Sequence, residues 1–403
     1  MKVIGAFASA VASAVVPVLA AAGGALLLGA CASCQSTARD TSMPVLAAGS
    51  FDGVEADQKA HHLYLADSAN HGVDVVDTSS ATPHFVGTID VAGLPNGLAF
   101  APDLHRLYAG LIGGYLAVID TDSMQVVKRL QVDTLAADLL DYSPQRQRVY
   151  IGTGQSGDVV AVDASTNEVK ERLPAKVPVE QPRYDPADGM LYASSTETDS
   201  VLKFNPATGT LTKTYKLAGC HVAGLAINPS RQLALATCGA TVAFINLGSG
   251  AYDISRLVAG GDLVTYDAAA DRFLVASSHS KNDSTVGVFY GDGRYLGSVA
   301  ATPRAHQAVF DDAHGVVYAV SATGLMSFKP RECEPPPEWL AFAGRGSVFV
   351  APMLVFALFL IWYARRPRGP AGPKWDDLKK EDLAAERERM RELEDSIYGP
   401  QVE

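Results

Sequence analysis

"AVIDTDSMQVVKRLQV", residues 117–132, is the stretch of the chain that decides the fold. An apolar run breaks at Asp120-Thr121-Asp122-Ser123, and the residues after it alternate between apolar and polar. Short polar side chains that hydrogen-bond their own backbone are typical of tight turns. Alternation with a period of two is typical of a strand with one buried face. The stretch therefore predicts a β-hairpin.

The same phrase recurs along the chain, as "VVAVDASTNEVKERLP" from Val159 and "VDVVDTSSATPHFVGTIDV" from Val73. A pair of residues that opens another short strand recurs with it, at intervals of 44, 42, 42, 42, 40 and 44 residues. A period of roughly 40–45 residues with this strand content is typical of four-stranded propeller blades. The pairs are Leu63-Tyr64, Leu107-Tyr108, Val149-Tyr150, Leu191-Tyr192, Leu233-Ala234, Phe273-Leu274 and Val317-Tyr318.

One unit reads from residue 96 as four strands, "NGLAFAP", "RLYAGLI", "GYLAVID" and "QVVKRLQV", from the axis outward. The last unit lacks its outer strand, because the three prolines of "RECEPPPEW" after residue 330 cannot extend a sheet. The segment "MPVLAAG", residues 43–49, stands where an outer strand should precede the first unit. We therefore expect an all-β, seven-bladed β-propeller over residues 43–330, with this N-terminal strand closing the last blade.

Two stretches, "LAVIDTDSMQVVKRLQV" and "LPNGLAFAPDLHRLYAG", carry a family resemblance. They resemble the YVTN/YncE-type β-propeller repeat, and the likeness covers residues 43–330 but fades in the fifth and sixth units. The resemblance implies a seven-bladed propeller. It also implies an exported protein, because such proteins are mostly exported. The resemblance does not imply a particular enzymatic activity.

The net charge of −11, without a basic stripe, argues against nucleic-acid binding. Residues 1–30 are almost uncharged and read as an export segment. They end in Leu28-Gly29-Ala30-Cys31, which resembles the bacterial lipobox, in which the cysteine is acylated. Ordinary cleavage at a small residue and an uncleaved anchor are the alternatives. Residues 31–42 then form a linker.

Residues 347–364 carry no charge, and Arg365, Arg366 and Arg368 follow directly. A span of about 27 Å, at ~1.5 Å per residue, predicts a transmembrane helix, and the arginines place its C-terminal side in the cytoplasm. A buried core helix is the alternative. The prediction gives a bacterial inner-membrane protein with a Pro-rich linker at 331–346, a propeller in the periplasm or outside, and a cytoplasmic tail at 365–403. Within the tail, Leu383, Met390 and Ile397 indicate either a docking seam or a solvated helix.

Aligning the innermost strands gives one polar column at the entry to the axial channel, followed by two packing columns. Converging carboxylates favour a bound cation, a cationic ligand group or a shared proton, and oxygen ligands suit Ca²⁺ or Mg²⁺. A wet channel that merely tolerates polar side chains is the alternative. We expect no catalytic residue and no cofactor other than Ca²⁺ at this mouth, and no haem or nucleotide motif is present in the sequence. The column reads Asp52, Asn96, Asp138, Glu180, Ala223, Asp262 and His306.

The positions of the five cysteines in the predicted propeller indicate a role for each of them. Cys220 and Cys238 flank a hairpin whose turn centres near residue 229, so they should face each other and form a disulfide in an oxidising compartment. In the closed ring, Cys34 and Cys333 fall on the same face and are predicted to pair. Cys31 is then left for the lipid.

These features predict a membrane-anchored, extracytoplasmic propeller that binds a ligand or a periplasmic or membrane protein. An accessory subunit of an inner-membrane complex is one form of this hypothesis. A propeller enzyme, either a lactonase-like hydrolase or a platform for an oxidoreductase, is the alternative.

Overall fold

The computed structural model describes residues 38–41, 43–44, 51–80, 82–261, 263–277, 284–301, 304–321, 324–331, 385, 387–389 and 391. The chain divides into two compact units, Met1–Cys333 and Glu334–Glu403. In the second unit the described residues are helical. All the described strands belong to the first unit.

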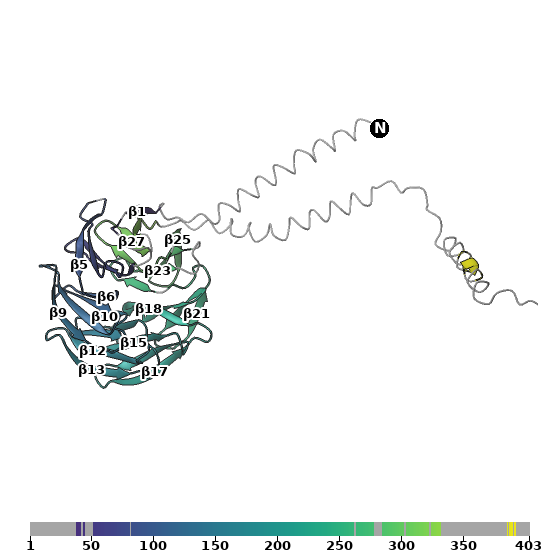
Figure 1. Cartoon of the computed structure of the whole chain (residues 1–403). Helices are drawn as coiled ribbons and strands as arrows, with labels where there is room; N and C mark the ends of the chain where they lie inside the picture. The colour runs from purple at the N-terminus through teal and green to yellow at the C-terminus, as the bar shows by residue number, and fades with distance from the viewer. Residues whose placement is uncertain are drawn as a thin grey trace, which may run out of the picture. The chain divides into compact units, whose positions relative to one another are not determined.

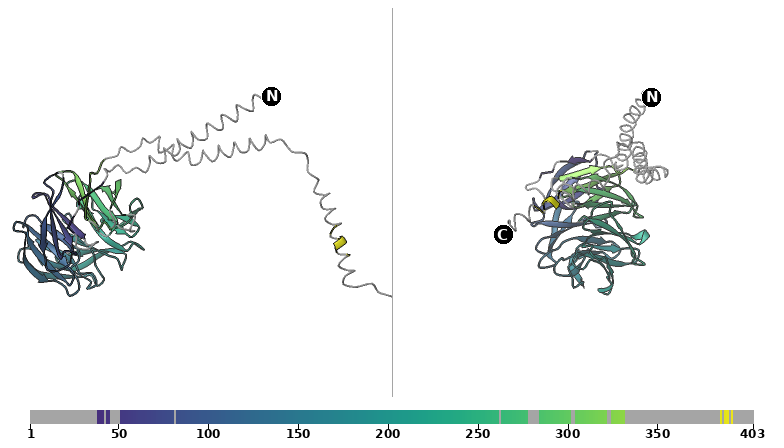
Figure 2. Two further views of the ribbon diagram at one scale, coloured as in Figure 1. Left: turned by 45° about the horizontal axis from the view of Figure 1, so that its top comes forward. Right: turned by 90° about the vertical axis from the view of Figure 1, so that its right-hand side faces the viewer.

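The first unit consists of seven four-stranded antiparallel sheets, which confirms the predicted seven-bladed propeller (Figure 1). We name the strands of a blade A to D from the axis outward. The A strands of neighbouring blades contact one another. Figure 2 shows the blades from two further directions, succeeding one another from purple through teal to green.

The first two blades consist of β2 (Phe51–Asp57), β3 (His62–Asp67), β4 (Gly72–Asp77) and β5 (His84–Asp90), then β6 (Pro95–Ala101), β7 (Arg106–Leu111), β8 (Tyr115–Asp120) and β9 (Gln125–Gln131). The next two consist of β10 (Leu140–Ser143), β11 (Arg148–Gly152), β12 (Asp158–Asp163) and β13 (Glu168–Pro174), then β14 (Pro182–Asp185), β15 (Met190–Ser195), β16 (Ser200–Asn205) and β17 (Thr210–Lys216). Blades five and six consist of β18 (Val222–Asn228), β19 (Leu233–Cys238), β20 (Thr241–Asn246) and β21 (Tyr252–Ser255), then β22 (Val264–Asp267), β23 (Arg272–Ser277), β24 (Thr285–Tyr290) and β25 (Tyr295–Ala300). The last blade consists of β26 (Ala308–Asp311), β27 (Val316–Ser321), β28 (Gly324–Phe328) and β1 (Arg39–Thr41), and a 3₁₀ turn, η1 (Pro229–Arg231), joins β18 to β19.

The hairpin at residues 117–132 is the C–D hairpin of the second blade. Strand β8 is buried at four of its six residues, whereas β9 alternates between exposed and half-buried residues. A strand between two neighbouring blades loses both faces to packing, and an edge strand keeps one face in water. This difference produces the change from an apolar run to an alternating pattern along residues 117–132.

The outer hairpins also share an irregularity. In blades one, two, three, four and six, the pairing of strands C and D shifts by one residue, as in a β-bulge. In the second blade Val118 is paired with Lys128 and Ile119 with Val126, which leaves Val127 as the extra residue on the outer strand. Such a bulge bends and twists the edge of a sheet.

The N-terminal strand closes the last blade, as predicted, but it lies earlier in the chain than residues 43–49. Strand β1 pairs with β28, with Arg39 opposite Ser327 and Thr41 opposite Leu325. Pro44 has no N–H to donate to a sheet. The side chain of Met43 is instead buried in the core between the first and last blades. The propeller therefore begins at Arg39 and not at residue 43 as predicted.

In the fifth unit, the residue pair predicted to begin the second strand, Leu233-Ala234, was placed one residue too early in the chain. Ala234 is paired with Ile227, as Leu63 is with Ala56 in the first blade. Leu233 therefore occupies the position of His62, and its apolar side chain caused the wrong alignment.

The disulfide between Cys220 and Cys238 is confirmed, with a Cα–Cα distance of 4.3 Å. Cys31, Cys34 and Cys333 lie outside the described residues, as do the export segment 1–30 and the predicted span 347–364. Within the described part of the chain, no helix has the length and apolarity needed to cross a bilayer.

Two buried carboxyl groups, Asp67 and Asp74, lie in the first blade near the closing segment. Both residues are fully buried. Asn70 donates from Nδ2 to the carbonyl of Pro44 at 2.7 Å and also to Asp67 Oδ2. Thr88 donates to Asp74 Oδ1, whereas no donor among the described residues reaches Asp74 Oδ2. Burial raises the pKa of Asp74 to about 7, with a smaller contribution from the carboxylate of Asp67 and opposition from the Thr88 hydrogen bond.

We predict that Asp74→Asn stabilises the protein at pH 8 and has little effect near pH 4. The pKa of Asp74 in the folded protein lies above its ordinary value of 3.8, so wild-type stability falls as the pH rises from about 4 to about 7. The gain at pH 8 should be roughly 1–3 kcal/mol, the cost of an uncompensated buried polar group. Thermal unfolding followed by circular dichroism across this pH range measures it. Asp253→Asn, at an exposed position of β21, is the control; equal pH profiles for wild type and Asp74→Asn would contradict the prediction.

Candidate functional site

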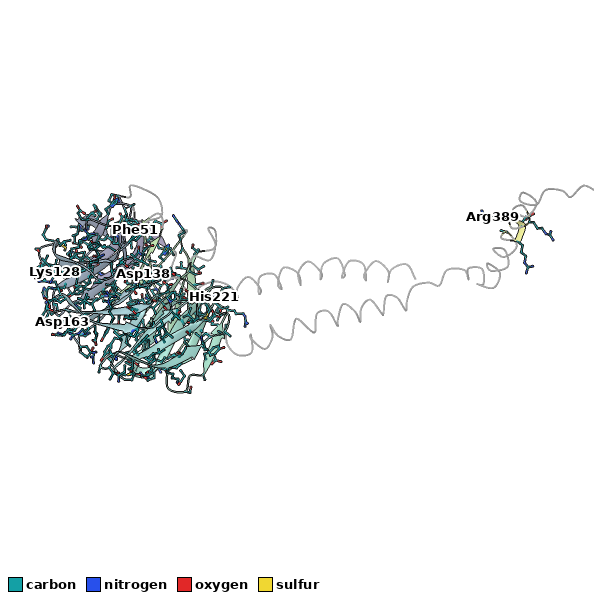
Figure 3. The ribbon with its side chains drawn as sticks, turned by 60° about the horizontal axis from the view of Figure 1, so that its bottom comes forward. Phe51, Lys128, Asp138, Asp163, His221 and Arg389 are labelled. Atoms are coloured by element: carbon teal, nitrogen blue, oxygen red, sulfur yellow. A yellow bond between two sulfur atoms is a disulfide. The ribbon has the colours of Figure 1, made fainter. Side chains whose placement is uncertain are left out.

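The predicted polar column lies at the beginning of the A strands. Asp52 and Asn96 are the second residues of β2 and β6. Asp138, Glu180 and His306 lie in the connections directly before β10, β14 and β26. Figure 3 labels Asp138, which represents this column, with Lys128 on the outer strand β9. Ala223 lies in β18, and Asp262 lies outside the described residues.

Members of this column on neighbouring blades approach one another. Asn96 donates from Nδ2 to Asp138 Oδ1 at 3.3 Å, across blades two and three. His306 Nδ1 lies 3.7 Å from Asp52 Oδ1, across blades seven and one. Glu180 accepts a hydrogen bond of 3.5 Å from Thr196 Oγ1 of its own blade. Within the described residues, no group of three or more His, Cys, Asp or Glu side chains is arranged to hold a metal ion.

Glycines at the start of two A strands, Gly53 and Gly97, allow members of the column to approach one another. The A–B pairing is irregular between Phe51 and Val54, and likewise after Pro95 and after Val222. A Cβ on Gly53 would lie 2.9 Å from the carbonyl oxygen of Asn96, and one on Gly97 would lie 2.5 Å from that of Asp138. Only glycine permits this approach of neighbouring backbones, which brings the polar side chains together.

Two buried glutamines connect the A strands below the mouth. Gln307 accepts a hydrogen bond at Oε1 from the backbone N–H of Val54 at 2.9 Å and donates from Nε2 to Thr265 Oγ1 at 3.3 Å. Gln181 accepts one from the N–H of Leu225 at 2.6 Å and donates to the carbonyl of Val264 at 3.4 Å. Each amide satisfies an N–H that the irregular A–B pairing leaves open, and each joins three blades.

A charged cluster lies deeper in the channel, formed by Glu55, Asp141 and Arg183 from blades one, three and four. Arg183 Nη1 lies 3.7 Å from Asp141 Oδ1 and donates to the carbonyl of Leu140 at 3.0 Å. Arg183 Nη2 donates to the carbonyl of Val264, in blade six, at 3.5 Å. Its two hydrogen bonds therefore join blade three to blade six, which are three positions apart in a ring of seven. The guanidinium group ties together blades on opposite sides of the axis.

Burial controls the charge state of this cluster. It raises the pKa of Glu55 to about 8, with opposition from the Arg183 guanidinium and a further increase from the Asp141 carboxylate. Burial also raises the pKa of Asp141 to about 6, opposed by Arg183 and by the hydrogen bond from the Tyr184 N–H. At neutral pH, Glu55 is therefore protonated beside an ion pair between Asp141 and Arg183.

This cluster is not predicted from the sequence. The columns that contain residues 52, 54 and 56 of the first unit leave out residue 55, which points the other way along the strand. The signal was nevertheless present, because three charged residues stand in a column of otherwise small or apolar ones. The full column reads Glu55, Ala99, Asp141, Arg183, Ala226, Thr265 and Val309.

No protein-family model matches this sequence, and no curated protein matches it. Solved structures with a similar fold exist. One is a chain of the structure titled "Crystal Structure of Mitotic Checkpoint Complex", with a TM-score of 0.60 and 14% sequence identity, covering 75% of this chain and 93% of that one. At this identity the likeness supports the propeller fold alone.

We predict that Gln307→Ala lowers the free energy of unfolding by roughly 1–3 kcal/mol, because the buried N–H of Val54 loses its acceptor. Chemical denaturation of the full-length protein measures the loss. Gln125→Ala, at an exposed position of β9, is the matched control and should change stability by less than about 0.5 kcal/mol. An equal effect of the two substitutions would contradict the role of the Gln307 amide as hydrogen-bond acceptor for the Val54 N–H.

We predict that Glu55 retains its proton at pH 7 and loses it with a midpoint near pH 8. Difference infrared spectroscopy should show a protonated-carboxyl band that titrates in this range and disappears in Glu55→Gln. Arg183→Gln should move the midpoint upward, because the removed cation favours the carboxylate. Glu168→Gln, at an exposed position of β13, should leave the band unchanged. A wild-type band already lost at pH 6 would contradict the prediction.

Proposed function

We propose that this chain is a non-catalytic, extracytoplasmic binding module that contacts a protein partner through the face that carries the channel mouth. One observation carries the proposal. Ile112 and Leu135 are 52% and 58% exposed, and they lie side by side because Ile112 bridges Ala136 and Gly113 donates to the carbonyl of Leu135. Adjacent exposed apolar side chains mark interaction surfaces.

The surroundings of this apolar pair support a protein partner. Leu135 lies three residues before Asp138, in the same connection between blades two and three. An apolar centre beside groups that can form hydrogen bonds is the composition of protein interfaces. The structurally similar propeller belongs to a structure titled as a complex, which agrees with a binding role for this fold.

The disulfide and several segments of the sequence support the proposed location outside the cytoplasm. The Cys220–Cys238 disulfide favours an oxidising compartment. The export segment 1–30, the lipidation motif at Cys31 and the apolar segment 347–364 support anchoring at the inner membrane. We further propose membership of the YVTN/YncE-type repeat family and a role as accessory subunit of a membrane complex. The chain leaves the last blade after β28, at the face opposite the mouth.

Site-specific photocrosslinking in cells tests the proposal. A photoreactive residue at position 112 or 135 of the full-length chain should give a discrete protein adduct. The matched controls are positions 127 and 169, which are 51% and 39% exposed and apolar but lie on the outer strands. They should give none. Adducts at none of the four positions, or equally at all of them, would contradict the proposal, and so would lactone or dehydrogenase turnover by the purified chain.

A further inference from the structure

The turns that join strands A and B in the first and last blades lie side by side. They span residues 57–62 and residues 311–316, at the opposite end of the A strands from the channel mouth. Gln58 of the first turn donates from Nε2 to the carbonyl of Phe310 at 2.6 Å and accepts at Oε1 from the N–H of Asp312 at 3.0 Å. These two hydrogen bonds hold the turns at a fixed spacing.

Two histidines face each other across this junction. The ring centres of His61 and His314 lie 5.9 Å apart, with an angle of 58° between the ring planes. With metal–nitrogen bonds of about 2.1 Å and about 1.1 Å from each nitrogen to its ring centre, two imidazoles on one ion have ring centres up to about 6.4 Å apart. The observed spacing therefore lies within the reach of a single metal ion.

The hydrogen bonds of the two rings leave nitrogen atoms open for such an ion. His314 Nδ1 lies 2.9 Å from Oδ2 of Asp311, which is buried. Because a carboxylate accepts hydrogen bonds, Nδ1 carries the proton, and Nε2 keeps a lone pair that can bind a metal. Among the described residues, no group forms a hydrogen bond with His61 Nδ1, although this atom is buried. A buried polar atom in this state indicates a bound ion or water.

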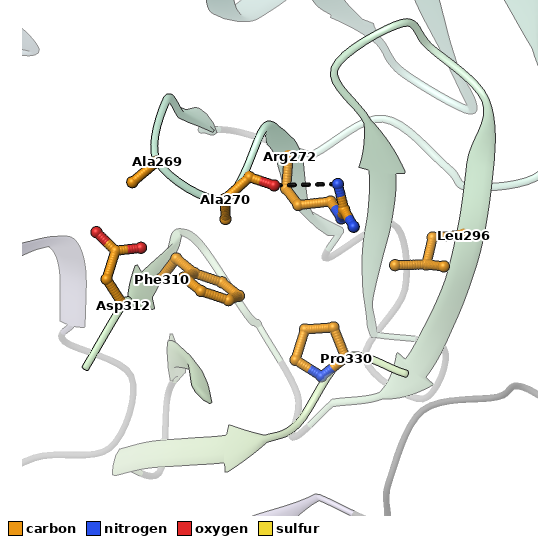
Figure 4. A pocket seen from close by; sticks show the side chains of 7 residues that line it. All are labelled: Ala269, Ala270, Arg272, Leu296, Phe310, Asp312 and Pro330. Carbon is orange, nitrogen blue, oxygen red and sulfur yellow. Dashed lines mark hydrogen bonds between the residues drawn. The ribbon is translucent and has the colours of Figure 1, made fainter. Parts of the chain in front are cut away.

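The surroundings of the pair favour a cation. On the side of the sixth blade, a cavity of about 380 Å³ borders the last-blade turn, and Phe310 and Asp312 line it (Figure 4). Partial burial and the neighbouring carboxylates of Asp267 and Asp311 raise the pKa of Asp312 above its ordinary range. Three carboxylates therefore lie close together at this end of the sixth and seventh blades. A cation bound nearby would reduce their mutual repulsion.

We propose that His61 and His314 together bind a late first-row divalent cation, such as Zn²⁺ or Cu²⁺, between the first and last blades. Imidazole suits these ions, whereas Ca²⁺ and Mg²⁺ prefer oxygen ligands. Within the described residues, no third His, Cys, Asp or Glu completes the pair, so water fills the remaining positions. An ion at this place links residues far apart in the sequence, where a cross-link most restricts the unfolded chain. It would therefore strengthen the closure of the ring.

Isothermal titration calorimetry with Zn²⁺ tests the proposal on the full-length protein in detergent, purified without a histidine tag and with its free thiols alkylated. We expect one ion per chain, with an affinity reduced about tenfold or more in His61→Gln and in His314→Gln, because each loses one of two ligands. Mg²⁺ controls for binding to acidic side chains and should not displace Zn²⁺. No Zn²⁺ binding at millimolar concentration, or an unchanged affinity in either variant, overturns the proposal.

Two other histidines in similar positions provide matched controls. His62 is the next residue, and its Nδ1 is also buried without a partner among the described residues, but its ring contacts Tyr64, which packs toward the second blade. His105 occupies the turn position of His61 in the second blade and pairs with a carboxylate. His62→Gln and His105→Gln should bind Zn²⁺ as the wild type does. A loss in either equal to that in His61→Gln contradicts the proposal.

Electron paramagnetic resonance identifies the ligands directly, so it remains informative where a substitution lowers stability. One equivalent of Cu²⁺ should give a spectrum with hyperfine splitting from two imidazole nitrogens in the wild type, because imidazole is a preferred ligand of this ion. His314→Gln should leave the splitting from one nitrogen. The same number of nitrogens in both proteins overturns the proposal, whatever the crosslinking at positions 112 and 135 shows.

Discussion

Each blade of this propeller has two apolar faces, and neither is buried unless another blade covers it. In the second blade, Leu107 packs toward the first blade and Tyr108 toward the third. A linear array of such sheets would expose one apolar face at each end, and a ring exposes none. The whole core therefore depends on the closing contact, in which β1 completes the last sheet and Met43 fills the space between the first and last blades.

The architecture could be predicted because each blade repeats one local pattern. The hairpin at 117–132 contains its own turn chemistry and its own burial pattern, so no distant residue is needed to interpret it. The Cys220–Cys238 disulfide was predictable for the same reason, since both cysteines flank a single hairpin. A closing N-terminal strand was predicted, but at the wrong residues, because it was placed only by its position before the first unit. That position does not reveal that Met43 turns into the core and that Arg39–Thr41 form the strand.

The charged cluster in the channel was not predictable in this way. Glu55, Asp141 and Arg183 come from three blades, and their proximity follows from how the A strands converge on the axis. Asp67 and Asp74 lie in one blade, but Asn70, which donates to Asp67, also donates to the carbonyl of Pro44 in the closing segment, and no local pattern predicts that contact. The polar column at the mouth is intermediate, because alignment predicted its members but not the close backbone approach at Gly53 and Gly97. Local periodicity predicts the individual strands. A site between blades can be predicted only when the relative positions of the blades are known.

The bulges of the outer hairpins have a consequence for how copies of this protein behave at high concentration. A straight outer strand would present a row of unpaired N–H and C=O groups, onto which the outer strand of another copy could add. In five blades the extra residue interrupts this row, and in β9 the extra residue is followed by Lys128 and Arg129. The circumference of the disc therefore resists strand addition. Self-association through the rim is disfavoured, and the two flat faces remain as the surfaces on which molecular recognition can evolve.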